Sequence, residues 1–395
     1  MNQLVKISHI PNSAYIHIPF CRKRCFYCDF PVSVLGDKLR GETSLGIQKY
    51  VEVLCQEIAA MHNYGQPLTT IFFGGGTPSL LSIPQIETIL KTLKKYVGFA
   101  PEPEISMEMD PGTFDLQHLQ GYVTAGVNRI SLGVQAFEDK LLQTCGRSHS
   151  VNDIFTAIDL VYRVGIPEFS LDLISGLPHQ TVEMWKDSLY QAIDINPTHI
   201  SVYDLTVEPG TAFGRYYQPG DKPLPGDDTT VQMYKMAHEI LTQAGYEHYE
   251  ISNYARVGHQ CVHNKVYWKN LPYYGFGMGA ASYLEGKRFN RPRKTKEYYA
   301  WIDNGAIIDC EVTPVDEKLL DTLMLGLRLA EGINLDKLSQ QFGKHKVELI
   351  QQALQPYVEK NWVEIIGERC FLVPPDGFLF SNTILSSLFN INFSE

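Results

Sequence analysis

Three of the eight cysteines crowd into a short stretch near the amino end of the chain, with the spacing Cys21-x3-Cys25-x2-Cys28. Short spacings bring several thiolates to one inorganic centre, so this stretch predicts a metal site. Three thiolates can hold three irons of a 4Fe–4S cluster and leave one iron open. An open iron can coordinate the amino and carboxylate groups of S-adenosylmethionine and pass an electron to its sulfonium.

The alternative interpretation of this stretch is a zinc site. A structural zinc ion takes four ligands, so the fourth would have to come from afar, such as Cys261 or a histidine. The neighbours Phe26, Tyr27 and Phe30 would supply a cluster with the apolar shell that tunes its potential and its access to solvent. The spacing itself favours the cluster.

Composition and charge narrow the class of protein. The chain has 395 residues, of which 44% are hydrophobic and 20% charged, as in folded globular proteins. This length allows two or three domains. The net charge of −10 argues against bulk nucleic-acid binding, so we expect no nucleic-acid partner. A run of about 18 apolar residues, which a spanning helix needs, does not occur in the sequence.

The cysteines outside the cluster bear on the cellular compartment. They are scattered singly and are expected to be small buried hydrophobes. The opening MNQLVKISHIPNSAY has neither an apolar core nor a small-residue cleavage site, so neither a secretory signal nor disulfides are expected. We therefore predict a cytoplasmic protein.

The elements that must position the cysteines alternate along the first two-thirds of the chain. Short runs rich in Ile, Val, Phe and Tyr predict strands, and longer amphipathic stretches between them predict helices. Such repeated strand–helix units imply a parallel sheet with right-handed crossovers. The expected strands are Tyr15–Ile18, Thr70–Phe73, Ile105–Met109, Asn128–Leu132, Phe169–Leu173 and His199–Leu205. The expected helices are 47–62, 84–96, 116–125, 151–164, 182–193 and 229–244.

The rest of the chain has a different pattern. The stretch 261–283 is rich in aromatic residues and glycine and does not predict regular structure. From about 311 onward, consecutive helices and an alternating run at 362–373 predict a small winged-helix-like domain. We expect a core domain over 1–300 and a second domain over 301–395.

The segment Tyr15-Ile-His-Ile-Pro-Phe-Cys21-x3-Cys25-Phe-Tyr-Cys28 resembles the radical S-adenosylmethionine superfamily. More narrowly, it is similar to the branch that holds oxygen-independent coproporphyrinogen III oxidases and HemW-type haem chaperones. The likeness covers most of the chain and is strongest from 14 to about 280. It implies an α/β fold, a partial (β/α) barrel of the radical SAM type with a small C-terminal winged-helix-like α+β domain. It also implies that Cys21, Cys25 and Cys28 hold a 4Fe–4S cluster.

The resemblance also assigns residues to S-adenosylmethionine. Glycines after a strand let a ligand approach the backbone closely, although a tight turn would explain them equally well. The other positions could be polar strand ends or surface ion pairs, but together they fit a ligand at the carboxyl face of a parallel barrel. The residues so assigned are Gly75, Gly76 and Thr77 for the amino group, Arg147 for the carboxylate, Asp172 for the ribose, and Glu108, Gln135, Tyr15 and Tyr27 as further contacts.

Two features separate the oxidase from the chaperone. The oxidase signature has a fourth cysteine two positions after the third, where this chain has Phe30. The segment His263-Asn-Lys-Val-Tyr-Trp268 resembles the HNxxYW motif of the chaperones, which implies a haem role for His263. An imidazole can ligate haem iron, whereas the plainer interpretation is a structural histidine beside two packed aromatic rings. Cys261 lies two residues away and could also meet iron.

The leading hypothesis is therefore a haem chaperone that carries a 4Fe–4S cluster and S-adenosylmethionine. It would bind haem and transfer it to acceptor haemoproteins, including membrane-bound ones, and a homodimer is one assembly that the hypothesis allows. The alternative is oxygen-independent coproporphyrinogen III oxidation, a radical oxidative decarboxylation. Whether the chain is also an enzyme stays open at this point, and the chaperone hypothesis requires no turnover.

Overall fold

The computed structural model describes residues 10–37, 40–61 and 63–393. Within them the largest sheet has nine strands in the order β11-β1-β4-β5-β6-β7-β8-β10-β9. The strands from β11 to β8 run parallel, and β10 and β9 add an antiparallel edge. The bounds are β1 Ser13–Ile18, β4 Leu68–Gly75, β5 Phe99–Met109, β6 Arg129–Gln135, β7 Glu168–Ser175, β8 His199–Asp204, β9 Glu247–Glu250, β10 Asn253–Ala255 and β11 Tyr274–Phe276.

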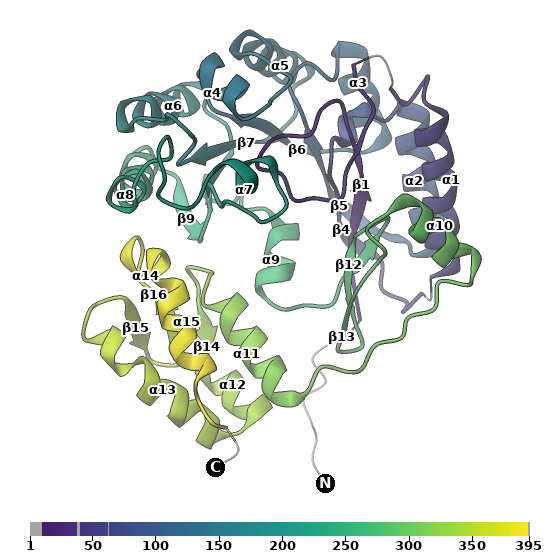
Figure 1. The fold of residues 1–395 in the computed structure, drawn as a ribbon. Coiled ribbons are helices and arrows are strands. Elements are labelled where there is room, and N and C mark those ends of the chain that lie inside the picture. The colour runs from purple at the N-terminus through teal and green to yellow at the C-terminus, as the bar shows by residue number, and fades with distance from the viewer. Residues whose placement is uncertain (1–9, 38–39, 62, 394–395) are drawn as a thin grey trace.

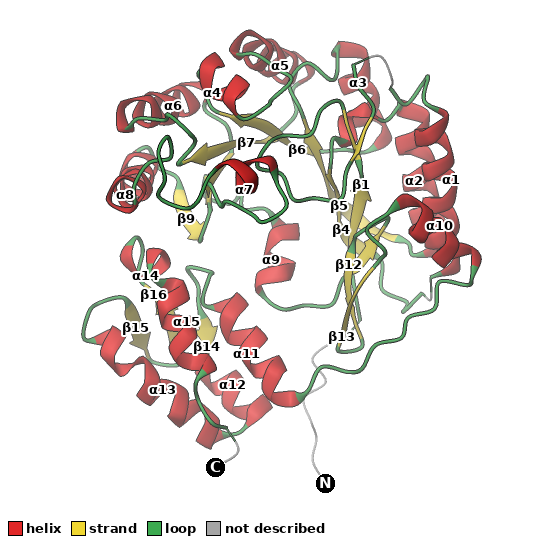
Figure 2. Ribbon diagram, viewed as in Figure 1, coloured by secondary structure: helices red, strands yellow, loops and turns green. Residues whose placement is uncertain are grey.

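Helices cover the outer face of this sheet, as Figures 1 and 2 show. The two outermost strands, β11 and β9, do not pair with each other, so the barrel is incomplete. The sheet and helices together confirm the expected α/β fold with a central parallel sheet. The covering helices are α1 Leu45–Ala60, α2 Ile83–Tyr96, α3 Leu116–Ala125, α5 Val151–Val164, α6 Val182–Ile195 and α8 Asp227–Gln243. The helix expected over 47–62 thus ends at Ala60, and residue 62 lies outside the described residues.

Local sequence explains where several helices begin and which face they bury. Helix α2 starts with a capping box, in which Ser82 and Gln85 satisfy each other's backbone N–H groups. Its buried residues Ile86, Ile89, Leu90 and Leu93 follow the helical period, so one side of the helix packs on the sheet. A second capping box at Ser150 and Asp153 starts α5 in the same way.

The C-terminal domain has its own hydrophobic core, built around buried leucines and isoleucines. Its order of helix, strand, helix, helix and β-hairpin is that of a winged helix, as expected from the sequence. The elements are α11 Val315–Gly326, β14 Ile333–Asn334, α12 Leu335–Phe342, α13 Lys344–Val358, β15 Val363–Ile366, β16 Arg369–Leu372, α14 Asp376–Leu379 and α15 Ser381–Phe389.

Helix α10, Thr295–Asp303, crosses the expected domain boundary at 300. Its buried Tyr298 packs into the core of the barrel, whereas buried hydrophobic residues from Leu319 of α11 onward belong to the second core. We therefore propose that the two domains divide within 304–314.

The stretch 261–283 contains regular structure, which the sequence did not predict. It forms α9 Val262–Trp268, β11, and β12 Ala281–Leu284, which pairs with β13 Lys287–Asn290. Distant residues stabilise these elements. The Glu104 carboxylate accepts hydrogen bonds from the backbone N–H groups of Val262 and His263, at 3.0 and 2.9 Å, at the start of α9. Strand β11 exists because it pairs with β1. A local pattern cannot reveal either contact.

Smaller elements complete the loops at the carboxyl ends of the strands. They are β2 Phe20–Cys21, β3 Ser33–Val34, the 3-10 turn η1 Pro78–Leu80, α4 Asp139–Thr144 and α7 Ala212–Tyr216. In the described part of the chain, no helix combines the length and the apolar character that crossing a membrane requires.

Candidate cofactor site

Cys21 ends β2, Cys25 and Cys28 lie on the loop that leads from it to β3, and all three side chains are half-buried. Neighbouring loops hold this loop in place. The Phe26 N–H donates to the Cys145 carbonyl at 2.9 Å, and the Phe213 N–H donates to the Phe26 carbonyl at 2.9 Å. His17 Nε2 contacts the Pro31 carbonyl at 3.2 Å. The loop is therefore fixed to β1, to the end of α4 and to α7.

Burial favours the protonated form of two of these thiols, Cys21 and Cys28. It raises the pKa of Cys21 to about 12, with smaller contributions from Asp110 and from the other two cysteines, and it raises the pKa of Cys28. A bound metal centre would supply the positive charge that makes them thiolates. Among the described residues, no three His, Cys, Asp or Glu side chains surround a point where a single metal ion would sit. A cluster carries its irons at separate corners, so its ligands do not converge on one point.

Arg147 links the cysteine loop to the strand ends. Its Nη1 donates to Cys25 Sγ at 3.3 Å, and its Nη2 donates to the Gly133 carbonyl at 2.9 Å and pairs with Asp110. Asp110 also accepts a hydrogen bond from Thr77 Oγ1 at 3.2 Å. Sequence reasoning assigned Thr77 and Arg147 but gave no role to Asp110, which holds them together.

The backbone conformation at the end of β6 places Gln135 beside Arg147. Its φ of 67° is in the left-handed region, at the point where the register of β6 with β7 shifts. A Cβ added at Gly133 would lie 3.0 Å from Gln135 Nε2 and 3.1 Å from Arg147 Nη2, so both side chains crowd the same point.

The glycines after β4 are required by packing. A Cβ at Gly76 would lie 2.7 Å from the Phe20 carbonyl oxygen and 2.8 Å from that of Ile18. The N–H groups of Gly76 and Thr77 donate to the same two carbonyls, and that of Gly75 donates to Glu108 Oε2 at 2.9 Å. Because these donors are engaged, a ligand's amino group would have to donate to carbonyl oxygens of the turn.

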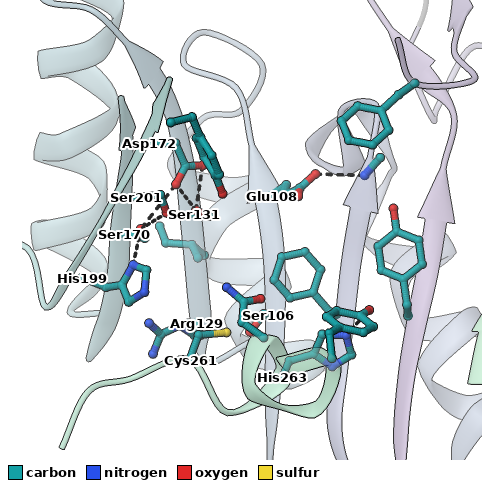
Figure 3. A pocket seen from close by; sticks show the side chains of 18 residues that line it. Ser106, Glu108, Arg129, Ser131, Ser170, Asp172, His199, Ser201, Cys261 and His263 are labelled. Atoms are coloured by element: carbon teal, nitrogen blue, oxygen red, sulfur yellow. Dashed lines mark hydrogen bonds between the residues drawn. The ribbon is translucent and has the colours of Figure 1, made fainter. Parts of the chain in front are cut away.

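A cavity of about 300 Å³ lies inside the barrel, lined by strands β1 and β4–β8 and by α9 (Figure 3). Five of the residues assigned from the sequence line it: Tyr15, Gly75, Glu108, Asp172 and His263. Cys261 also lines it, whereas the three clustered cysteines, Tyr27, Gly76, Thr77, Gln135 and Arg147 lie outside its lining. The site therefore has two parts, the cysteine loop with Arg147 and the polar interior of the barrel.

Sequence reasoning missed the serines of this cavity. Ser106, Ser131, Ser170 and Ser201 stand on four neighbouring strands. The sheet register pairs Glu108 with Ser131, Ser131 with Ser170, and Asp172 with Ser201. Polar residues at alternate positions of otherwise apolar strands were the available signal, since alternate side chains of a strand share one face.

Hydrogen bonds connect polar side chains on neighbouring strands of the barrel (Figure 3). Ser131 Oγ contacts both carboxylate oxygens of Asp172 at 2.8 Å. Ser170 Oγ contacts His199 Nδ1 at 2.8 Å, and His199 Nε2 contacts the Tyr249 hydroxyl at 2.9 Å. Burial raises the pKa of Asp172, although hydrogen bonds from the surrounding serines oppose it.

Whether a nucleoside cofactor fits this site depends on whether it supplies partners for the buried polar atoms that lack them. Ser106 Oγ and Arg147 Nε have no hydrogen-bond partner within the described residues. Burial raises the pKa of Glu108 to about 8. Such groups are costly to bury unless something polar meets them. A cofactor with ribose hydroxyls, a carboxylate and a positive charge supplies partners for the hydroxyl, the guanidinium and the carboxyl group respectively, so the residues present fit S-adenosylmethionine.

His263 is fully buried, and both of its ring nitrogens are engaged. Nδ1 contacts Thr70 Oγ1 at 2.8 Å, and Nε2 contacts the Tyr267 hydroxyl at 2.8 Å. The ring stacks on Phe72 with the centroids 5.2 Å apart, and burial lowers its pKa to about 3. Ligation of haem iron would require one of these hydrogen bonds to break, so a haem role for His263 stays a prediction.

The model of the radical SAM superfamily matches residues 15–190, and that of the HemN C-terminal domain matches residues 314–380. The structure of coproporphyrinogen III oxidase (HemN) from Escherichia coli superposes with a TM-score of 0.82 at 24% identity, covering 98% of this chain and 92% of that one. The half-barrel and its cysteine loop thus define a radical SAM protein, which implies a 4Fe–4S cluster and S-adenosylmethionine as cofactors.

Two relatives match nearly end to end. "Heme chaperone HemW" of Synechocystis is 48% identical over 96% of this chain and 97% of the relative. "Heme chaperone HemW" of Escherichia coli K12 is 38% identical over 95% of this chain and 97% of the relative. The chain therefore belongs to the HemW family within the radical SAM superfamily.

Proposed function

We propose that this chain is a haem chaperone, which binds haem and transfers it to acceptor haemoproteins. The similarity to relatives named as haem chaperones, over almost the whole length of the chain, carries the proposal. The similarity to the oxidase structure is an argument for the fold alone.

Phe30 supports the chaperone over the oxidase. It occupies the position where the oxidase signature has a fourth cysteine, it is 58% exposed, and it lines the barrel cavity. A phenyl ring can neither donate a proton there nor act as a thiolate, as a cysteine could.

We assign Cys21, Cys25 and Cys28 to the 4Fe–4S cluster, which when bound supplies an electron to the sulfonium of S-adenosylmethionine. Arg147 fixes the Cys25 side chain and holds Asp110 beside it. Glu108 and Asp172 accept hydrogen bonds from opposite sides of the cavity (Figure 3). The proposed cofactor contacts are Tyr15, Tyr27, Gly75, Gly76, Thr77, Glu108, Gln135, Arg147 and Asp172.

The affinity for S-adenosylmethionine is expected to rise with pH through the pKa of Glu108. The Glu108 carboxyl, with its pKa raised by burial to about 8, is neutral at pH 6.5 in the absence of cofactor. A cationic cofactor stabilises the carboxylate, so binding releases a proton below pH 8 and strengthens as pH rises toward it. We expect about tenfold tighter binding at pH 8.5 than at pH 6.5, measured by anaerobic calorimetry in two buffers of different ionisation enthalpy.

The Glu108→Gln variant is the matched control for this pH dependence. It cannot ionise, and it keeps an oxygen that can accept the Gly75 N–H. Binding should then be weak and independent of pH over this range. A variant that retains the full pH dependence would remove Glu108 from the explanation.

The function itself is tested by haem transfer. Anaerobically reconstituted protein is loaded with haem, mixed with an apo-haemoprotein and separated by size, and the haem absorbance of each fraction is measured. We expect haem to move to the acceptor faster than from a nonspecific carrier such as serum albumin. Incubation of the same sample with coproporphyrinogen III and S-adenosylmethionine should yield no protoporphyrinogen. Absence of haem binding, or formation of that product, would contradict the proposal.

The proposal extends to the setting of the protein. We propose a cytoplasmic location, membrane-bound haemoproteins among the acceptors, and a homodimer as the assembled form.

A further inference from the structure

A cleft of about 970 Å³ lies between the C-terminal domain and the barrel. One wall is the end of α9 with the β12–β13 hairpin, and the other comes from α11, β14 and α12. These elements are labelled in Figure 1. Small-molecule sites have volumes of about 300–1,000 Å³. The barrel cavity, at about 300 Å³, suits a small ligand, whereas this cleft has room for a large one.

Each wall of the cleft carries apolar side chains among polar and charged ones. Trp268, Leu271 and Pro272 line the barrel side and are only half-buried. Leu329 and Ile333 line the side of the C-terminal domain. Apolar side chains on two facing walls suit a flat ligand with an apolar ring, because both faces of the ring then leave water.

Four cationic side chains, Lys269, Lys318, Lys337 and Arg369, line this cleft together with three glutamates, Glu285, Glu331 and Glu368. Two of the four are engaged: Lys269 pairs with Glu331 at 2.9 Å, and Arg369 donates to the backbone carbonyl of Glu331. Lys318 and Lys337 have no ion-pair partner among the described residues. The structure therefore leaves two ammonium groups available to an anionic ligand.

Neither lysine is held in its position by an ion pair within the described residues. Lys318 reaches from α11 to the β12–β13 turn, since a Cβ added at Gly286 would lie 2.7 Å from its Nζ. Lys337 lies in the first turn of α12, where the helix dipole disfavours a positive charge. Two unpaired cations at the edge of this cleft match a planar ligand with two carboxylates.

We propose that this cleft binds the tetrapyrrole, with the ring between the apolar side chains of the two walls and the propionate carboxylates on Lys318 and Lys337. The inference rests on the proposed haem-chaperone function and places its ligand. It uses the Trp268 end of the HNxxYW segment, whereas His263 at the other end lines the barrel cavity.

The lining also predicts how the iron is held. Among the described residues of the cleft, no His, Cys or Met is present, and Tyr283 is the one side chain of a usual haem-ligand type. Burial raises the pKa of Tyr283, which keeps it a neutral phenol and a weak ligand. Recognition through the ring and the carboxylates, without a strong bond to iron, leaves the haem exchangeable, as transfer requires.

The test measures the affinity of the full-length reconstituted protein for ferric haem and for metal-free protoporphyrin IX. We expect the wild type to bind both with affinities within about tenfold of each other, because the iron contributes little. The double variant Lys318→Gln/Lys337→Gln should bind each at least about tenfold more weakly, since it loses two charge-assisted contacts. Lys296→Gln, an exposed lysine of α10 outside the cleft, is the matched control and should bind as the wild type does.

A second variant blocks the cleft sterically. Gln341 is exposed and lines the cleft, so Gln341→Trp adds bulk there at little cost to folding. It should also weaken binding, with an unchanged iron and sulfide content of the cluster. Wild-type affinity in both the double variant and Gln341→Trp would overturn the cleft assignment while the chaperone function stood. Failure of the wild type to bind either porphyrin would instead overturn the function.

Discussion

Replacing Cys25 by serine is expected to abolish the iron–sulfur centre. Each thiolate of the loop holds one iron in the proposed cluster, and an alcohol is a poor ligand for iron at neutral pH. With one thiolate lost, a second iron has no protein ligand, and the cluster should not survive isolation. After anaerobic reconstitution, we expect the brown chromophore to be absent and iron and sulfide to fall close to zero.

The substitution leaves the protein framework in place, which makes the result interpretable. Cys25 Sγ accepts one hydrogen bond, from Arg147, and a serine oxygen can accept the same bond. The backbone bond that anchors the loop, from Phe26 to Cys145, does not involve the Cys25 side chain. Cys55→Ser, at a half-buried thiol of α1, is the matched control and should keep full iron. Retention of full iron by the Cys25 variant would contradict the cluster assignment.

The largest expected loss of folding stability comes from Glu57 on α1. This carboxylate, 2% exposed, accepts hydrogen bonds from Arg291 Nε at 2.7 Å, from the Tyr298 hydroxyl at 2.6 Å and from the Gly277 N–H at 2.8 Å. It thus connects α1 to α10 and to the turn after β11. Because β11 pairs with β1, the same carboxylate supports the strand that leads into the cysteine loop.

Glu57→Ala should reduce the free energy of unfolding by about 3–5 kcal/mol. Removal of one partner of a buried ion pair leaves the other charge without compensation, here the fully buried Arg291 guanidinium. The Tyr298 hydroxyl and the Gly277 N–H lose their acceptor as well. The measurement is anaerobic denaturation with guanidinium chloride, followed by circular dichroism.

An exposed ion pair provides the control for this experiment. Glu87 pairs with Lys91 at 2.7 Å on the surface of α2, and such pairs contribute about 0.5 kcal/mol or less. Glu87→Ala should therefore unfold almost as the wild type does, and Glu57→Gln, which keeps an acceptor oxygen, should lie between. Equal midpoints for Glu57→Ala and Glu87→Ala would show that the buried network contributes no more than a surface pair.

The cysteine spacing and the strand–helix alternation were sufficient to indicate the family and the fold. Strands such as β4 and β7 form where the apolar runs are, because burial on both faces of a parallel sheet requires them to be nearly continuous. Helix α5 begins at Ser150 and ends before Gly165, and both signals are local. Local signals of this kind also predicted α3 with its observed bounds, Leu116–Ala125.

Features that depend on distant contacts were missed. The capping of α9 by Glu104 joins positions more than 150 residues apart, and Asp110 acquires its role only because Arg147 reaches it from another loop. The cleft forms where two domains meet, so no single stretch of sequence describes it. Such sites combine side chains from several elements, each of which is unremarkable in its own segment.

The sequence by itself determined the cysteine loop, the order of strands and helices, and the family, because these depend on residue type and short-range spacing. Only the tertiary structure decided the partners of each buried polar group. It engaged both nitrogens of His263, gathered the serines around Asp172, and left Lys318 and Lys337 without an ion-pair partner in the part of the chain that the structure describes. The physical reason is that hydrogen bonds and ion pairs act over a few ångströms in space, and the chain brings distant residues that close only once it has folded.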